Sequence, residues 1–229
     1  MEMLYRDDRV IVCIKPVGVL STDEPGGLPE LARHALGEPQ ANLRTLHRLD
    51  RVVGGLILLA ETARAASDLS AQIRSGAFEK EYLALCHGVC PEKGVMEDEL
   101  FRDKARHKTM VAPRAGRETQ TARLEYERVG IAGDLSLVRI RLQTGRTHQI
   151  RAQFSARGFT LAGDRKYGAV DAFGDVGLWS WRISFLHPRT GCRMTACKPP
   201  APIGVWETAG SILSEFPTII PDPNLGKIR

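Results

Sequence analysis

The sequence at positions 47–60 reads HRLDRVVGGLILLA, a charged tetrapeptide that leads into an apolar run. The apolar part, residues 54–60, has the length and composition of a central strand buried on both faces. His47, Arg48 and Asp50 therefore stand at the mouth of a buried strand, where polar groups line a sheet edge or a cleft. A solvated loop with a local Arg–Asp pair is the alternative interpretation of the same residues.

Further strands are predicted on both sides of this stretch from apolar runs and from alternation of apolar and polar residues. They cover residues 9–15, 80–87, 121–128 and 135–143. Near the end, the segments WSWRISF, HPRTG and CRMTACK are typical of a hairpin of two strands joined by a turn.

Three short helices are predicted between the strands. The first lies within residues 26–37, with Pro29 near its start and Gly37 as its stop. The second runs from the N-cap Thr62 to residue 74, and the third covers residues 147–157 with Thr147 as N-cap. Because the strands cluster instead of alternating with helices, the sequence predicts an α+β fold around one mixed sheet, in a single domain of residues 1–229.

Composition narrows the classes of function. The chain has 229 residues, of which 43% are hydrophobic and 26% charged, so it can bury a substantial core. A net charge of +5 favours polyanionic partners such as nucleic acid, although this signal is weak alone. No apolar run approaches the roughly 18 residues of a membrane span, and the charged start MEMLYRDDRVIV is unlike a signal peptide. We therefore expect a cytoplasmic protein without a membrane partner.

The cysteines argue against a disulfide framework. Five are present, and an odd count without a secretory leader indicates reduced thiols. The pairs Cys86/Cys90 and Cys192/Cys197, together with His87, suggest a zinc site, but their spacings are looser than the usual C-x2-C. We therefore expect no metal, and interpret the cysteines as small buried apolar residues.

A second group of polar residues lies at 144–151, TGRTHQIR. A strand ends there, a glycine turns the chain and a helix begins, so that donors cluster at the helix start. Free backbone N–H groups at such a start also favour anions. The segment is a candidate site for a phosphate or a catalytic carboxylate, and the alternative is a capped helix with surface arginines.

Two further features are an aromatic residue on a strand and a dense basic stretch. Tyr82 lies in the strand KEYLAL on the same face as Ala84 and Cys86, where it is either core or a platform on which a base stacks. Residues 98–118 are predicted to form an exposed hairpin or loop that carries the densest basic stretch: Arg102, Lys104, Arg106, Lys108, Arg114 and Arg117.

Together these motifs resemble those of the RluA-type pseudouridine synthases, in the same order. The segments that carry the likeness are HRLDRVVGGLILLA, KEYLAL, RDKARHKTMV, LQTGRTHQIRAQFSARGFTLAGDRKYG and WSWRISFLHPRTGCRMTACKPP. HRLD followed about 95 residues later by TGRTHQIR is a highly specific combination. The likeness runs from about residue 3 to 203, which leaves 204–229 as a C-terminal tail.

The resemblance implies a pseudouridine synthase fold: a curved, mixed and mostly antiparallel sheet with flanking helices and a central active-site cleft. It implies isomerisation of uridines in tRNA or ribosomal RNA by base flipping, without a cofactor, and we expect a monomer. By position in the motifs, Asp50 is the essential aspartate, Arg151 pairs with its carboxylate, and Tyr82 stacks on the target base.

The resemblance also indicates which residues contact RNA. Arg48 matches an arginine that handles the flipped nucleotide, and the basic stretch matches a loop that clamps RNA. The RNA-binding residues expected are Arg48, His47, Arg146, His148, Arg102, Lys104, Arg106 and Lys108. With no S4-type RNA-binding module expected before the domain, the catalytic domain supplies most of its own RNA contacts.

The sequence departs from the family pattern beside the expected site. The family usually has HRLD-x-x-T-S-G, whereas Val53 and Gly54 occupy the Thr and Ser places here. A histidine commonly follows HQIR by one residue, and Gln153 stands there instead. The departures keep open a non-catalytic RNA-binding or ribosome-assembly protein with the same fold.

An unrelated metal-dependent nuclease or hydrolase using Asp50, His47 and His148 is the other alternative. Such sites usually need several clustered carboxylates, and Asp50 is the one carboxylate in the two motifs.

Overall fold

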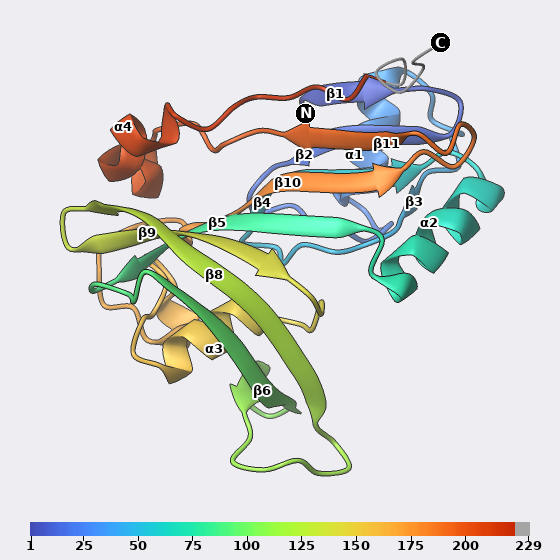
Figure 1. The fold of residues 1–229 in the computed structure, drawn as a ribbon. Helices are drawn as coiled ribbons and strands as arrows, with labels where there is room; N and C mark the ends of the chain where they lie inside the picture. Colours follow the sequence, from blue (N-terminus) through green and yellow to red (C-terminus); the bar gives the residue numbers. More distant parts are fainter. Residues whose placement is uncertain (223–229) are drawn as a thin grey trace. The chain divides into compact units, whose positions relative to one another are not determined.

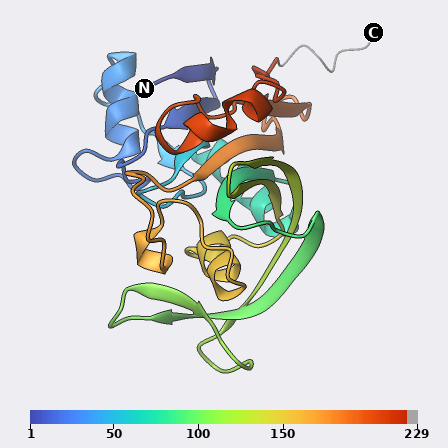
Figure 2. The ribbon, with the colours of Figure 1, turned by 90° about the vertical axis from the view of Figure 1, so that its left-hand side faces the viewer.

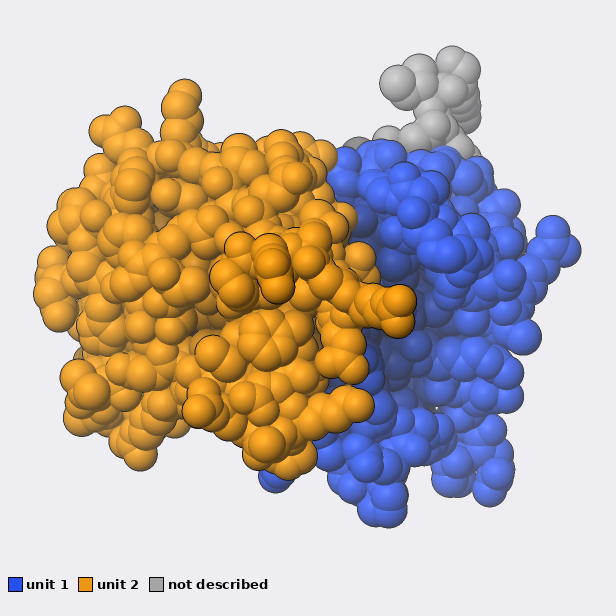
Figure 3. Space-filling view, turned by 90° about the horizontal axis from the view of Figure 1, so that it is seen from below, with its two compact units in different colours: residues 1–80, 179–199, 216–229 blue, residues 81–178, 200–215 orange. Residues whose placement is uncertain are grey.

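The computed structural model describes residues 1–222, which divide into two compact units (Figure 3). Unit 1 comprises Met1–Lys80, Trp179–Pro199 and the chain from Phe216 onward. Unit 2 comprises Glu81–Leu178 and Pro200–Glu215. Within the described residues, no helix is both long and apolar enough to cross a membrane.

The sheet of unit 1 is mixed (Figure 1). Its strands are β1 (Met3–Arg6), β2 (Val10–Lys15), β3 (Arg44–Thr45), β4 (Gly54–Ala60), β10 (Leu178–Leu186) and β11 (Arg193–Cys197). They pair in the order β1-β2-β4-β10-β11, and β3 also pairs with β4. The β4–β10 pair is parallel, and the other pairs in this unit are antiparallel.

Strand β4 is the centre of unit 1, as its sequence predicts. Every residue of the strand is buried, and its side chains pack with those of β2 and β10 in one apolar cluster. Two helices belong to this unit: α1 (Leu28–Leu36) and α2 (Ala63–Ser75). The Thr62 side chain accepts a hydrogen bond from the Ala65 backbone nitrogen, which confirms the predicted N-cap of α2. Gly76 ends that helix in the left-handed conformation.

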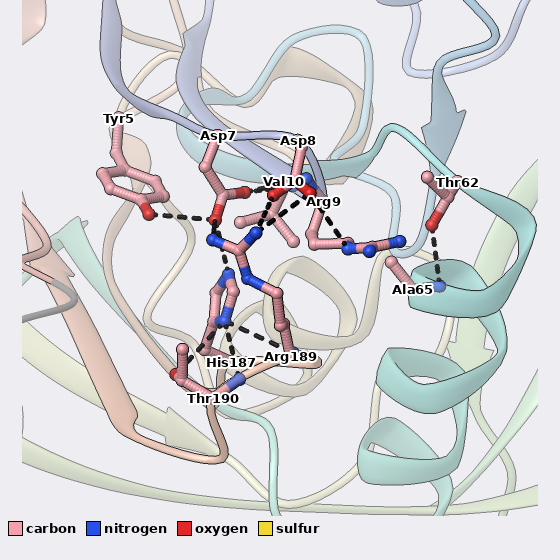
Figure 4. Close-up of polar contacts among 10 residues, drawn as sticks. All are labelled: Tyr5, Asp7, Asp8, Arg9, Val10, Thr62, Ala65, His187, Arg189 and Thr190. Carbon is pink, nitrogen blue, oxygen red and sulfur yellow. Dashed lines mark hydrogen bonds and ion pairs between the residues drawn. The ribbon is translucent and has the colours of Figure 1, made fainter.

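A cluster of half-buried and buried polar residues joins two turns of unit 1 (Figure 4). Asp7 follows β1 and accepts hydrogen bonds from the backbone nitrogens of Arg9 and Val10 and from the Tyr5 hydroxyl. His187 follows β10, and its Nε2 lies 2.8 Å from Asp7 Oδ2. Burial alone raises the pKa of Asp7, but these donors and His187 outweigh it and hold the pKa below its usual value. The cluster fixes the β1–β2 turn against the β10–β11 hairpin.

The sheet of unit 2 is antiparallel throughout. Its strands are β5 (Glu79–His87, of which residues from Glu81 belong to this unit), β6 (Lys93–Asp103), β7 (Lys108–Val111), β8 (Gln120–Ala132) and β9 (Leu135–Leu142). They pair in the order β5-β9-β8-β6-β7. Helix α3 (Gln149–Ala156) lies inside the curve of β8 and β6 (Figure 2), and the short helix η1 (Arg165–Tyr167) packs beside it.

The prediction of an α+β fold with a mixed, mostly antiparallel sheet is confirmed. One predicted cap is wrong: α3 begins after His148, not after Thr147. His148 has φ 55 and no side-chain cap; instead, the Gln149 side chain accepts a hydrogen bond from the Arg146 backbone nitrogen.

The C-terminal tail, expected from residue 204, contains two short helices. Residues of unit 2 there form η2 (Gly204–Ala209) and α4 (Gly210–Leu213), and Trp206 is buried. Ile212 packs so closely on Gly130 of β8 that a Cβ at that glycine would lie 2.6 Å from Ile212 Cδ1. The last seven residues of the expected tail, 223–229, lie outside the described part.

Candidate active site

The HRLD segment of unit 1 is held on both sides of Asp50. His47 and Leu49 are buried, Arg48 is exposed and Asp50 is half-buried. The Ser21 hydroxyl donates to the Leu49 carbonyl at 3.0 Å and accepts from the Leu49 nitrogen at 3.1 Å. Behind the aspartate, the Val53 nitrogen donates to the Asp50 carbonyl at 2.9 Å and closes a turn into β4. The backbone that presents the Asp50 carboxylate is therefore fixed.

Lys15, at the end of β2, is a buried cation beside this aspartate. Its side chain is fully buried, and Nζ donates to the carbonyls of Pro16 at 2.9 Å and Val19 at 2.6 Å. Burial lowers the pKa of Lys15 to about 8, while the negative charge of Asp50 acts in the opposite direction. Lys15 is not among the site residues predicted from the motifs, although a lysine that ends a buried strand before the breaks Pro16 and Gly18 was the available signal.

His47 lies in the apolar interior of unit 1. Its Nε2 accepts a hydrogen bond from the Leu58 backbone nitrogen at 3.2 Å, and its ring packs on Phe78 with centroids 5.1 Å apart. Burial, with a smaller effect of Lys80, lowers the pKa of His47 to about 3. The imidazole is therefore neutral and supports β4, and a direct contact of His47 with RNA stays a prediction.

The glycine that departs from the family pattern has a packing reason. A Cβ at Gly54 would lie 2.5 Å from Cζ3 of Trp179 on the adjacent strand β10. The next residue, Gly55, has φ +116 and approaches the Ser180 backbone, where a Cβ would lie 2.3 Å from the carbonyl oxygen. The Trp179 ring thus fills the space that a serine side chain at position 54 requires.

In unit 2, Arg151 is held by the buried carboxylate of Asp164, which was not among the predicted site residues. Its Nε lies 2.7 Å from Asp164 Oδ2 and its Nη2 lies 2.8 Å from Asp164 Oδ1. The side chains are 4% and 1% exposed, respectively. A bidentate pair of this kind fixes the plane of the guanidinium group. The available signal was Asp164 itself, which lies in the quoted motif TLAGDRKYG.

Tyr82 is a buried residue of β5 in unit 2, paired across the sheet with Ile140. Its neighbours Leu83 and Leu85 are also fully buried, so both faces of this part of the strand are covered. Because Asp50 belongs to unit 1 whereas Arg151 and Tyr82 belong to unit 2, the pairing of Asp50 with Arg151 and the stacking role of Tyr82 stay predictions.

The basic stretch forms an exposed hairpin, as predicted. Strands β6 and β7 pair from Leu100↔Val111 to Asp103↔Lys108. Arg102, Lys104 and Arg106 are exposed, whereas Lys108 is half-buried. The hairpin of unit 2 therefore presents cations to solvent in the way that phosphate contacts require.

The other expected RNA-binding residues of unit 2 lie where β9 leads into α3. Arg146 is exposed, and its Nε donates to the Thr121 carbonyl at 3.1 Å. His148 is half-buried, and its Nδ1 lies 3.0 Å from the Tyr167 hydroxyl.

Gln153, the second departure, is a fully buried link between α3 and the sheet. Its Nε2 lies 2.7 Å from Asp98 Oδ2 and 3.3 Å from the carbonyls of Met96 and Ala122. Asp98 also accepts a hydrogen bond from Arg157 at 2.9 Å. The glutamine therefore helps to seat the helix that carries Arg151.

Four of the cysteines are buried and Cys192 is half-buried, and none belongs to a metal-binding arrangement among the described residues. Cys86 and Cys90 place their sulfur atoms 3.0 Å apart, and the contact with Cys90 together with burial raises the pKa of Cys86. His87 does not join them; its Nε2 lies 2.6 Å from Asp171 Oδ2. Across residues 1–222, no group of three or more His, Cys, Asp or Glu is placed to hold a metal ion.

Comparison with known proteins defines the class of protein. The family model for RNA pseudouridylate synthase matches residues 9–156, a stretch that contains both Asp50 and Arg151. The chain is 34% identical over 211 residues to the dual-specificity RNA pseudouridine synthase RluA of Escherichia coli (strain K12), covering 87% of this chain and 93% of that protein. The chain therefore belongs to the RNA pseudouridylate synthase family.

Longer relatives also match. Identity is 32% over 204 residues with the uncharacterized RNA pseudouridine synthase YlyB of Bacillus subtilis (strain 168), covering 83% of this chain and 66% of that protein. It is 30% over 209 residues with ribosomal large subunit pseudouridine synthase D of Nitrosomonas europaea, covering 83% of this chain and 59% of that protein. The match thus spans less than two thirds of the length of these two relatives.

Solved structures bear out the predicted fold. Human RNA pseudouridylate synthase domain containing 1 aligns with a TM-score of 0.75 at 21% identity, covering 99% of this chain and 92% of that chain. Human RNA pseudouridylate synthase domain containing 4 aligns with a TM-score of 0.72 at 22% identity, covering 93% of each chain. The pseudouridine synthase fold expected from the motifs is therefore confirmed.

Proposed function

We propose that this chain is a pseudouridine synthase that isomerises specific uridines in structured RNA, either tRNA or ribosomal RNA, without a cofactor. The observation that carries the proposal is the family match over residues 9–156, which includes both the HRLD and the HQIR motifs. We further propose that it acts in the cytoplasm as a monomer.

The reaction breaks the N1–C1′ bond of a uridine, turns the uracil and joins C5 to C1′, after which C5 loses its proton and N1 takes one up. Substrate and product are isomers, so no oxidant or group donor is required. We assign the essential carboxylate to Asp50, which attacks the sugar or the base or removes a ribose proton. The buried charge of Lys15 supports this assignment, because a neighbouring cation favours an ionised carboxylate.

Arg151 is proposed to hold the Asp50 carboxylate ionised and aimed at the substrate. The bidentate contact with Asp164 supports this role, since it fixes the guanidinium plane from one side. A buried cation in a fixed orientation is a preorganised electrostatic element that does not need to rearrange during the reaction.

RNA binding is proposed to extract the target base. Flipping a base out of a stem costs roughly a few kcal/mol, and stacking on an aromatic ring returns about 1–3 kcal/mol. We assign the stacking role to Tyr82, in a cleft at the active site. The phosphate contacts are assigned to the hairpin cations and to Arg48, Arg146 and His148, and such contacts weaken as salt rises.

The test uses RNA labelled with tritium at C5 of uridine, because the reaction releases that hydrogen. Purified protein is expected to release tritium, and Asp50→Asn is expected to fold and bind RNA without any release. Asp8→Asn serves as the matched control, since it makes the same change at an exposed residue of the same unit and should release tritium at the wild-type rate.

Two results contradict the proposal. Tritium release by Asp50→Asn under single-turnover conditions removes the role of Asp50. RNA binding by the wild-type protein without release from any RNA fraction favours the non-catalytic alternative. Pseudouridine mapping in a deletion strain and its parent then identifies the RNA and the uridine.

A further inference from the structure

Tyr167 lies at a junction of basic segments in unit 2. It ends η1, is buried, and its Oη lies 3.0 Å from each of three atoms: the Thr109 nitrogen, the Thr109 carbonyl oxygen and Nδ1 of His148. A phenol donates one hydrogen bond and accepts two. All three contacts are satisfied when Tyr167 donates to the Thr109 carbonyl and accepts from the Thr109 N–H and a protonated His148 Nδ1.

The ring of the same tyrosine contacts two cations. Lys108 Nζ lies 4.6 Å from the ring centroid, and Cζ of Arg151 lies 5.0 Å from it. Both distances are within the roughly 6 Å over which a cation is attracted to an aromatic ring. Lys108 comes from the β6–β7 hairpin and Arg151 comes from α3, so one side chain touches both the hairpin and the arginine.

The four residues from Asp164 to Tyr167 connect Arg151 of α3 to Thr109 of β7 through hydrogen bonds. At one end, Asp164 holds the Arg151 guanidinium by two hydrogen bonds. At the other end, the Tyr167 hydroxyl hydrogen-bonds with both the backbone nitrogen and the carbonyl oxygen of Thr109 in β7. The Tyr167 nitrogen donates to the Asp164 carbonyl at 2.9 Å, and the Ser155 hydroxyl of α3 donates to the Tyr167 carbonyl at 2.8 Å.

We propose that Tyr167 is a positioning residue that couples RNA binding on the β6–β7 hairpin to the orientation of Arg151. The inference rests on the proposed function, because it assigns Arg151 to the reaction and the hairpin to RNA. When a phosphate engages Lys108, the contacts of Tyr167 with Lys108 and Thr109 transmit the change to η1, and η1 carries it to the Asp164–Arg151 pair. Bound RNA thereby stabilises the orientation in which Asp164 already holds Arg151.

The first test is Tyr167→Phe, which keeps the ring and its two cations but removes all three hydroxyl contacts. We expect the single-turnover rate at saturating RNA to fall by roughly 10-fold, the size expected when such hydrogen bonds are lost. The Kd for RNA should change by less than about two-fold, because no phosphate contact is removed. A merely structural role does not predict this split between rate and affinity.

The control is Tyr126→Phe, which removes the hydroxyl of a half-buried tyrosine on β8 whose ring packs on Phe154. It should react at the wild-type rate. The inference is overturned if Tyr167→Phe also reacts at the wild-type rate at saturating RNA, or if Tyr126→Phe shows the same loss.

A second pair of variants tests the same link if Tyr167→Phe does not fold. Lys108→Met and Lys104→Met each remove one cation from the same hairpin, and of the two it is Lys108 that lies over the Tyr167 ring. Both variants should bind RNA more weakly, and only Lys108→Met should also lower the single-turnover rate of the bound complex. Equal single-turnover rates for these two variants at saturating RNA overturn the coupling.

Failure of this inference is distinct from failure of the proposed function. If the wild-type protein forms no pseudouridine, the proposed function fails before any variant is compared, and the coupling fails with it. If the wild-type protein is active and Tyr167→Phe equals it, only the coupling is lost.

Discussion

At the scale of single residues, each unit holds a buried cation, Lys15 in unit 1 and Arg151 in unit 2. Lys15 has three carbonyl oxygens near Nζ and the charge of Asp50 in its field. Arg151 has the Asp164 carboxylate. Charges are rarely buried without partners because desolvation is costly. At Lys15 and at Arg151, the fold therefore accepts a cost in stability and holds a charge in a fixed position.

Lys15 predicts a pH dependence with opposite signs for activity and stability. Burial lowers its pKa from 10.5 to about 8, so above about pH 8 the native protein loses the cation beside Asp50. We expect the single-turnover rate to fall above about pH 8, and we expect this fall to be absent from the pH–rate profile of Lys15→Met. Between about pH 8 and 10.5, Lys15 binds more protons in the unfolded chain than in the native protein. Its contribution to the free energy of unfolding therefore rises with pH.

The measurement is the difference between wild type and Lys15→Met in rate and in urea unfolding across this pH range. Parallel pH profiles for the two proteins contradict the assignment of Lys15 as a cation that titrates near pH 8.

Asp164 predicts a large loss of stability. Asp164→Asn leaves the buried Arg151 charge without its carboxylate, and breaking a buried ion pair in this way costs about 3–5 kcal/mol. Urea unfolding measures the loss, and tritium release should slow as well because the guanidinium is no longer fixed. Glu127→Gln breaks the exposed pair with Arg139 and should change the free energy of unfolding by less than about 1 kcal/mol. A loss for Asp164→Asn no greater than that of the control argues against a structural ion pair.

At the scale of elements, the contact between β4 and β10 explains a departure from the family pattern. The two strands are parallel neighbours, with Trp179 opposite Gly54 and Ser180 opposite Gly55. Strand β10 approaches so closely that side chains at the two glycines would overlap it. The departure at Gly54 therefore belongs to packing within unit 1, and it gives no support to a non-catalytic protein.

Restoring the family serine tests this packing. Gly54→Ser should lower the free energy of unfolding by about 1–3 kcal/mol, the usual effect of overpacking a core. Trp179→Leu provides room, so the double variant should lose less than the sum of the two single losses, as urea unfolding of all three proteins will report. Strict additivity would show that the serine and the indole do not compete for space.

At the scale of the whole molecule, the regular spacing of apolar residues in the sequence predicted the strands and helices most reliably. The buried strand 54–60, the helix capped by Thr62 and the C-terminal hairpin follow from local pattern, and all three are found. The wrong cap at Thr147 arose because a left-handed residue such as His148 leaves no mark in the sequence. Asp164, Tyr167 and Lys15 were missed because their partners are set by tertiary packing, which a single sequence does not display.

We propose that a carboxylate held ionised by an arginine carries the isomerisation. The most direct measurement is the distance between the Asp50 carboxylate oxygens and the Arg151 guanidinium nitrogens in an experimental structure of the protein bound to RNA with its target uridine. We expect contact at about 2.7–3.2 Å, with the uracil flipped onto Tyr82. Side chains of residues 50 and 151 that lie far apart in that complex, or point away from the flipped base, would contradict it.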